Sequence, residues 1–106
     1  MYIYNVTTNI DAAVHDEWLT WIKTHITEVL NTGKFTSAKL TEVLVEEEMG
    51  GKTYSIQYAA NTREDLENYY TFNAPKLELE GLKRFADKML TFKTELKIID
   101  EFYPIN

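Results

Sequence analysis

Hydrophobic and polar positions alternate with a period of two in four separated stretches of the chain. The first covers residues 2–9, "YIYNVTTN", and the others are "SAKLTEVLVEEE", "KTYSIQYAAN" and "TFKTELKIIDEF", the last running up to Pro104. Such alternation, in segments rich in β-branched and aromatic residues, is typical of β-strands. Gly50 and Gly51 lie between the second and third stretches and can adopt the positive φ angles of a tight hairpin turn. The pattern therefore predicts four strands, with the middle two forming a hairpin.

A helix is predicted between the first two strands. Asp11 can accept hydrogen bonds from the free amide groups at a helix start, and Asp16 and Glu17 suit the positive end of the helix dipole. The helical pattern continues to Leu30. Gly33, in "NTG", can take the left-handed conformation that ends a helix.

A second helical region is predicted between the third and fourth strands. Thr62 and Asp65 have the spacing of a capping box, which indicates a helix start. Pro75 and Gly81 interrupt the stretch that follows. We therefore expect two or three short helices there instead of one long helix.

The order of the elements predicts an α+β fold of the ferredoxin-like class, βαββαβ. Four antiparallel strands carry the first helix and the broken second helical region on one face, in a single domain of residues 1–106. The other face must meet water or a partner, and a second copy of the sheet is the simplest cover, so we expect a homodimer. On the third strand the apolar row of Tyr54, Ile56 and Tyr58 should meet the helices. The opposite row is mostly polar and would form a wet interface or an exposed surface.

One side of the first helix carries large side chains and a histidine. At about 100° per residue, this stripe comprises Val14, Trp18, Trp21, Ile22, His25 and Val29. His25 is therefore predicted to point toward the sheet. It is a core histidine whose ring nitrogens are hydrogen-bonded, a general base or a haem or metal ligand in a cavity between helix and sheet, or a residue that lines the surface.

Tyrosines from neighbouring strands are predicted to gather on the same side of the sheet. Their rings either pack in the core or line a cavity suited to a planar apolar ligand, with a few polar groups. His25 is the candidate catalytic residue. The candidate ligand-binding residues are Trp18, Trp21, His25, Tyr4, Tyr54 and Tyr58.

The composition narrows the possible chemistry. The absence of cysteine excludes disulfides, thiolate metal sites and cysteine nucleophiles, and the net charge of −6 opposes nucleic-acid binding. His15, beside two acids in "HDEW", is expected to be solvated, and the two histidines give a weak metal signal, so no metal or cofactor is predicted. Glu46, Glu47 and Glu48 are interpreted as a solvated run that protects a sheet edge, with divalent-cation binding as the alternative.

The amino-terminal stretch "MYIYNVTTNI" has no basic region and its apolar residues alternate, so it is expected to be neither a signal peptide nor a membrane anchor. No run approaches the roughly 18 apolar residues that a spanning helix needs. We therefore expect a cytoplasmic protein without a membrane segment.

Six segments carry a family resemblance. In order, they are "YNV", "WLTWIKTHITEVLNTGKF", "VEEEMGGKTYSIQY", "APKL", "LKRFADKML" and "FKTELKI". Over nearly the whole chain they resemble the small bacterial proteins grouped as domain of unknown function 4286. The resemblance implies the dimeric α+β barrel superfamily, in which two ferredoxin-like sheets pack together and each subunit can hold a cleft between helices and sheet. It implies no established activity.

Relatives in that superfamily include monooxygenases of antibiotic biosynthesis, haem-degrading enzymes, muconolactone isomerase-like proteins and stress-responsive barrels. Some of them place a histidine in the first or second helical region, and the matching position here is His25 in "WIKTHITEV". The resemblance also implies a histidine before "AP", where this chain has Asn73. This chain therefore lacks the second histidine that a two-histidine mechanism would use.

Three functions fit these observations. The first is a homodimeric module that binds a small apolar or aromatic molecule in an aromatic cleft near His25. The second is a cofactor-independent monooxygenase or isomerase with His25 as acid or base, which rests mainly on fold analogy. The third is a purely structural or assembly protein, which a cavity filled completely by Trp18, Trp21 and the tyrosines would favour.

Overall fold

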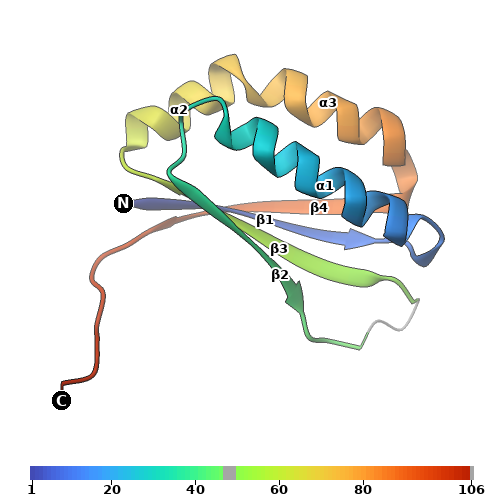
Figure 1. The fold of residues 1–106 in the computed structure, drawn as a ribbon, viewed down its shortest axis with the longest axis horizontal. Coiled ribbons are helices and arrows are strands. Elements are labelled where there is room, and N and C mark those ends of the chain that lie inside the picture. The colour runs from blue at the N-terminus through green and yellow to red at the C-terminus, as the bar shows by residue number, and fades with distance from the viewer. Residues whose placement is uncertain (47–49, 106) are drawn as a thin grey trace.

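The protein folds as one four-stranded antiparallel sheet with helices on one face. A computed structural model describes residues 1–46 and 50–105. The sheet order is β2-β3-β1-β4, and the strands are β1 (Tyr2–Ile10), β2 (Ser37–Val43), β3 (Lys52–Ala60) and β4 (Met89–Lys97). The helices are α1 (His15–Leu30), α2 (Arg63–Phe72) and α3 (Ala74–Phe85), which lie on the same side of the sheet (Figure 1). The predicted ferredoxin-like βαββαβ fold is confirmed.

The end signals of α1 lie at the predicted residues, but Asp11 caps the turn before the helix, and α1 itself has no side-chain cap at Val14. The Asp11 carboxylate accepts a hydrogen bond of 2.8 Å from the amide of Ala13 and so caps the short 3-10 turn Ala12–Val14 that leads into α1. The helix ends at Leu30, and Gly33 follows with a φ of +78°. Within the described part of the chain, no helix has the length and apolar character needed to cross a membrane.

The second helical region is broken, as expected, but only at one of the two predicted positions. Thr62 Oγ1 accepts a hydrogen bond of 3.0 Å from the amide of Asp65 and caps α2. The break falls at Asn73, and Pro75 lies in the first turn of α3, where a missing amide hydrogen is tolerated. The prediction that Gly81 interrupts the helix is wrong. Gly81 is buried within α3, and the ring of Trp21 occupies the space that a side chain at this position would fill.

The strand predictions need two corrections at their ends. β2 ends at Val43, so residues 44–51 separate it from β3 and the predicted tight turn is wrong. Glu46 is exposed, whereas Glu47 and Glu48 lie outside the described residues. β4 ends at Lys97 instead of continuing to Pro104, because Lys97 already pairs with Tyr2, the first residue of β1, and the partner strand ends there.

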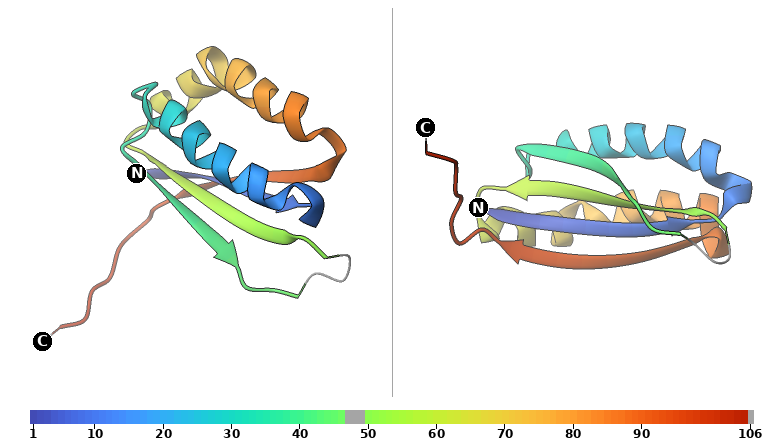
Figure 2. Two further views of the ribbon diagram at one scale, coloured as in Figure 1. Left: turned by 45° about the vertical axis from the view of Figure 1, so that its right-hand side comes forward. Right: turned by 90° about the horizontal axis from the view of Figure 1, so that it is seen from below.

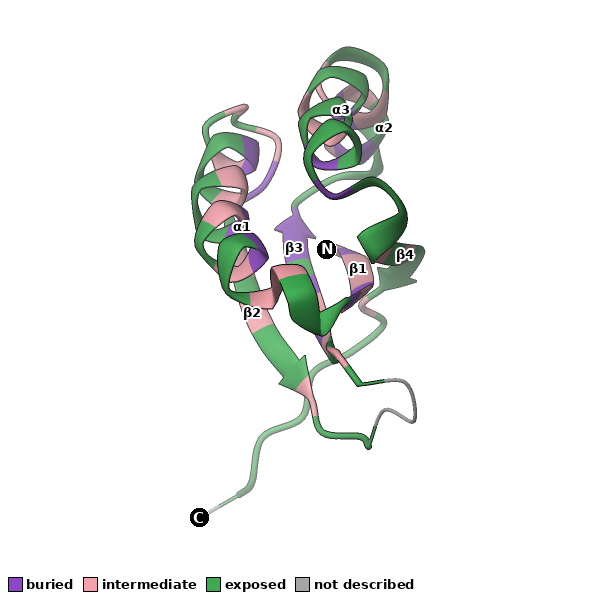
Figure 3. Cartoon of the chain, turned by 90° about the vertical axis from the view of Figure 1, so that its right-hand side faces the viewer, coloured by how far each residue is buried: buried purple, intermediate pink, exposed green. Residues whose placement is uncertain are grey.

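The two faces of the sheet differ in what they contact. On the covered face, the buried residues of β1 and β3 form a core with α1, α2 and α3 (Figure 3). On β4 the polar and apolar side chains face the opposite way from the one that burial would favour. Thr91 and Lys93 face the helices, whereas Leu90 and Phe92 face outward and are exposed. The open face therefore carries an apolar row along β4.

The chain beyond β4 runs away from the rest of the fold (Figures 1 and 2). It begins at Ile98, whose amide donates to the carbonyl of Met1 over 3.0 Å. The large apolar side chains farther along it are each at least 76% exposed, and they are Ile99, Phe102, Tyr103 and Ile105. We call residues 98–105 the C-terminal segment.

The two glycines before β3 provide a test of the fold. Both have positive φ angles, +77° at Gly50 and +79° at Gly51, but a Cβ at Gly51 would lie 2.5 Å from the carbonyl oxygen of Ile10, whereas one at Gly50 would contact nothing. Gly50→Ala should cost about 1 kcal/mol of stability through backbone strain alone. Gly51→Ala should cost about 3 kcal/mol or more, because the loop must also move off β1. Urea unfolding of both variants measures this, and equal losses would contradict the close packing.

Candidate functional site

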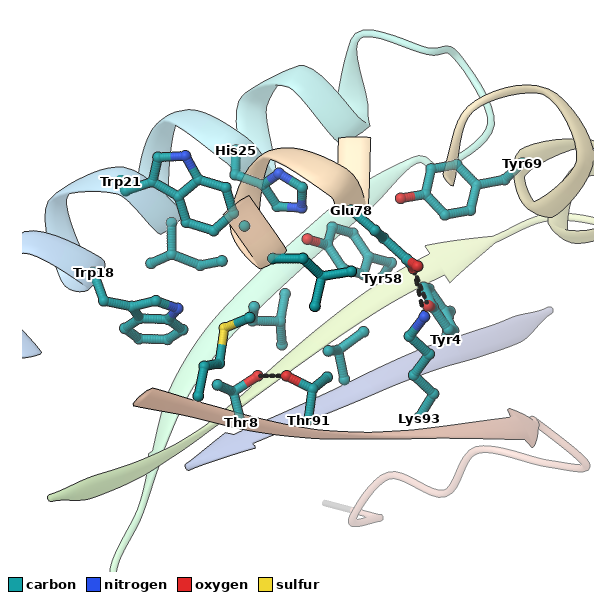
Figure 4. A pocket seen from close by; sticks show the side chains of 16 residues that line it. Tyr4, Thr8, Trp18, Trp21, His25, Tyr58, Tyr69, Glu78, Thr91 and Lys93 are labelled. Atoms are coloured by element: carbon teal, nitrogen blue, oxygen red, sulfur yellow. Dashed lines mark hydrogen bonds and ion pairs between the residues drawn. The ribbon is translucent and has the colours of Figure 1, made fainter. Parts of the chain in front are cut away.

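A cavity of about 320 Å³ lies between α1, α3 and the covered face of the sheet. Its walls are mostly aromatic and aliphatic, and its floor is formed by β1, β3 and β4 (Figure 4). Of the predicted ligand-binding residues, five line this cavity: Tyr4, Trp18, Trp21, His25 and Tyr58. Five of the six candidate side chains chosen from the sequence pattern therefore line the same cavity.

The α1 wall contains two buried nitrogens that no other described group satisfies. Trp18 and His25 are two helical turns apart on the same side of α1. Trp18 Nε1 and His25 Nδ1 are buried, and neither has a hydrogen-bond partner among the described residues. Figure 4 shows both rings directed into the space between α1 and the sheet. Because buried polar groups in folded proteins are nearly always paired, these two nitrogens are exceptions among the described residues.

His25 is held in position by stacking instead of by a hydrogen bond at Nδ1. The Trp21 ring stacks on the imidazole with 4.6 Å between centroids and 22° between planes, and it meets Phe85 edge-on at 5.4 Å. A Cβ at Gly81 would lie only 2.9 Å from the Trp21 ring. The glycine therefore lets α3 approach closely enough to press Trp21 against His25. The interpretation of His25 as a fully bonded core histidine does not account for Nδ1.

Burial sets the charge of His25. Desolvation lowers its pKa below the ordinary value of 6.5, and the carboxylates of Glu80 and Glu78 oppose this to a smaller extent. The imidazole is therefore neutral at pH 7, with one nitrogen a donor and the other an acceptor. Such a ring can accept or give a proton, or orient a bound molecule.

The opposite end of the cavity is built from tyrosines. The ring of Tyr4 stacks on that of Tyr58 at 6.0 Å and 27°, and is tilted by 54° against Tyr69 at 5.9 Å. Burial raises the pKa of all three phenols, and the nearby Glu78 adds to this effect. These groups are therefore uncharged hydroxyls over the physiological pH range.

One ion pair supplies the only formal charges that the described lining residues bring to the cavity. Lys93 Nζ donates to Glu78 Oε1 over 2.6 Å, and the Tyr4 hydroxyl donates to the same oxygen over 3.3 Å. Lys93 and Glu78 also border a second, more polar depression of about 650 Å³ that includes Arg63 and Glu95. The pair thus lies where the apolar cavity meets a charged surface.

Tyr54 is the predicted ligand residue that does not line the cavity. Its hydroxyl lies 2.6 Å from His15 Nε2, and the two rings stack at 5.7 Å. The ring of Trp18 also packs against Tyr54, with 5.1 Å between the ring centroids. The expectation that His15 is solvated is therefore wrong. His15 lies one turn before Trp18 on α1, so its ring also faces the sheet, at the start of the stripe that contains Trp18.

Other lining residues were not singled out by the sequence. They include Thr8 and Thr91, whose hydroxyl oxygens are 3.2 Å apart on the floor, together with Tyr69, Glu78 and Lys93. The alternation of β4 could have placed Thr91 and Lys93 on one face. The alternation could not show that the face with Thr91 and Lys93 meets the helices, because the exposed apolar residues of β4 lie on the opposite face. In residues 1–46 and 50–105, no group of three or more His, Asp or Glu side chains could hold a metal ion.

Solved structures of similar fold cover nearly the whole chain at low sequence identity. A dimeric ferredoxin-like protein from an uncultured marine organism has a TM-score of 0.73 and 7% identity, over 95% of this chain and 97% of that one. A cofactor-independent oxygenase from Streptomyces nogalater has a TM-score of 0.67 and 7% identity, over 94% and 95%. A hydroxynitrile lyase from Passiflora edulis has a TM-score of 0.62 and 16% identity, over 97% of both chains. At these identities the likeness shows the fold alone.

The sequence itself gives a more specific assignment. No curated protein matches the chain. A family model does match, over residues 1–99, and this range includes the strands and helices of the described residues and the lining of the cavity. The chain therefore belongs to the family described as domain of unknown function 4286.

Proposed function

We propose that this protein is a homodimeric module that binds a small, largely apolar molecule in the aromatic cavity beside His25. The carrying observation is the cavity of about 320 Å³ whose wall contains the unpaired Trp18 Nε1 and His25 Nδ1. Protein cores are close-packed, with few voids larger than a water molecule. A ligand would fill the space and supply the missing partners. The volume is at the lower end of the roughly 300–1,000 Å³ of small-molecule sites.

The homodimer is supported by the apolar surface of the open sheet face. Leu90, Phe92 and Leu96 form a row along β4 that no helix covers. The C-terminal segment adds further exposed apolar side chains next to the end of this strand. Exposed apolar side chains gathered along one strand are typical of protein interfaces. Similar solved structures described as dimeric ferredoxin-like proteins favour a second copy of the chain as the partner.

A cofactor-independent monooxygenase or isomerase is the second candidate. The neutral, half-buried His25 favours it, because an imidazole with an unpaired nitrogen beside a cavity is suited to moving a proton to or from a bound molecule. One solved structure of similar fold is described as a cofactor-independent oxygenase. A rate that does not vary with pH across the histidine range would count against this candidate. The purely structural alternative expects a filled cavity, and the open volume gives it less support.

Native mass spectrometry of protein purified gently from its own cells tests binding and assembly together. We expect twice the 12.4 kDa protomer mass plus the mass of a retained molecule. His25→Leu should lose the additional mass because it removes a polar partner in the cavity. His15→Leu is the matched control and should retain it, because His15 contacts Tyr54 outside the cavity. An empty wild-type dimer, or a His25→Leu variant that keeps the ligand and is more stable, would favour a packing role.

Replacing Phe92 by lysine tests the interface. Phe92 is 60% exposed on the open face, so Phe92→Lys should leave the protomer folded while placing a charge in the apolar row. Its dimer dissociation constant should rise at least about tenfold, since burying an unpaired charge is costly. Phe72→Lys is the control, because Phe72 is 72% exposed at the end of α2, on the helix layer. Light scattering after size-exclusion measures both, and equal behaviour of the two variants would place the interface elsewhere.

The lowered pKa of His25 predicts how stability changes with pH. In the ligand-free protein the folded state keeps this histidine neutral to lower pH than the unfolded state does. Below the unfolded pKa of about 6.5 the unfolded chain therefore binds more protons, and stability falls as the pH falls. Urea unfolding at pH 7.5 and 5.5 should show a smaller loss in His25→Leu than in the wild type. Equal losses would show that His25 is accessible to protons in the folded state.

A further inference from the structure

We propose that the molecule bound in this cavity is a flat, uncharged aromatic compound that presents a hydrogen-bond acceptor, such as a carbonyl oxygen, to Nε1 of Trp18. This inference rests on the proposed small-molecule function and specifies the chemistry of its ligand. It follows from the hydrogen-bonding capacity, the charges and the shape of the groups that line the cavity.

The requirement for an acceptor comes from the indole of Trp18. The residue is fully buried, and its Nε1 has no partner among the described residues. An indole N–H can only donate, so the missing partner must offer a lone pair. A hydrocarbon in the same space would leave the donor buried and unpaired, which is unfavourable. An oxygen or ring nitrogen on the ligand would remove that penalty.

The requirement for an uncharged ligand comes from the distribution of charge. The single lysine among the described lining residues, Lys93, already pairs with Glu78 at 2.6 Å. An anion would find no free cation on this lining and would lie near the Glu78 carboxylate. A cation would compete with Lys93 for Glu78 and would have to lose its hydration in an aromatic cavity. A neutral molecule meets neither cost.

The requirement for a flat aromatic molecule comes from the walls. Rings of Trp18, Trp21, Tyr4 and Tyr58 surround the space, which lies between the helix layer and the sheet (Figure 4). Aromatic faces favour offset or edge contacts with another ring. The volume of about 320 Å³ suits one ring system and a short substituent. His25 Nδ1, on the same helix wall, offers a second polar contact that would fix the orientation of the ring.

The test compares three probes of nearly equal shape: 2-acetylnaphthalene, which has a carbonyl acceptor, 2-ethylnaphthalene, which has none, and 2-naphthoate, which is an anion. Equilibrium dialysis of the wild-type protein at pH 7 gives the three affinities. The ketone should bind about tenfold more tightly than the hydrocarbon, in line with one hydrogen bond to an otherwise unpaired donor. It should also bind more tightly than 2-naphthoate.

Two variants separate the hydrogen bond from packing. Trp18→Phe removes the donor and should bring the affinities for 2-acetylnaphthalene and 2-ethylnaphthalene to within about twofold of each other. Trp21→Phe removes the same indole volume from the same helix, but its nitrogen is not one of the unpaired buried atoms. It should weaken both ligands while preserving the preference for the ketone.

A measurement on the unmodified protein keeps the test valid if Trp18→Phe does not fold. The indole N–H resonance of Trp18, assigned with Trp21→Phe, should move downfield when 2-acetylnaphthalene binds and should move less with 2-ethylnaphthalene. Equal affinities for the two probes with an unmoved resonance would overturn the acceptor proposal while leaving small-molecule binding intact. Tighter binding of 2-naphthoate would overturn the uncharged ligand. Absence of binding by all three at millimolar concentration would contradict the proposed function itself.

Discussion

The hydrogen-bonded pairing of β1 with β3 on one side and β4 on the other is the constraint on which the rest of this structure depends. β1 is central in the sheet although it comes first in the chain. Its register sets Tyr4 opposite Tyr58 on β3 and opposite Glu95 on β4. Because side chains alternate between faces, this register also determines which residues of the neighbouring strands join Tyr4 beneath the helices. A shift by one residue would replace the whole floor of the cavity.

The helix layer leaves space over this floor because its contacts are made at particular points. α1 places Trp18 and Ile22 on the sheet, and α3 approaches α1 where Gly81 meets Trp21. Between these contacts the two helices and the sheet enclose the cavity, with aromatic rings on most sides. The same packing holds His25 against Trp21 without satisfying its Nδ1. Aromatic walls and unpaired polar atoms are the features on which the proposed ligand site rests.

The open face of the sheet follows from the same pairing. β4 directs Lys93 and Glu95 toward the helix layer, where Lys93 pairs with Glu78 and Glu95 with Arg63 at 2.9 Å. Its apolar residues are thereby turned outward, where Leu90 and Phe92 remain exposed in the single chain. Lys93 thus lies at the cavity and Glu95 at the neighbouring polar depression, while the apolar groups of β4 are available to a partner. The proposed binding site and the proposed interface therefore lie on opposite sides of one strand.

The sequence by itself determined the element order, the ferredoxin-like fold, the caps at Asp11 and Thr62, and the side of α1 that carries Trp18 and His25. These features depend on the hydrophobic periodicity within each element and on the capping residues at its ends, which are close together in the sequence. Only the tertiary structure decided that β4 faces the helices with its polar row, that Tyr54 pairs with His15 away from the cavity, and that Gly81 contacts Trp21. Each of these results from the relative placement of elements far apart in the chain. Local periodicity contains no information on such distances, and so it could identify the side chains of the site but not the space between them.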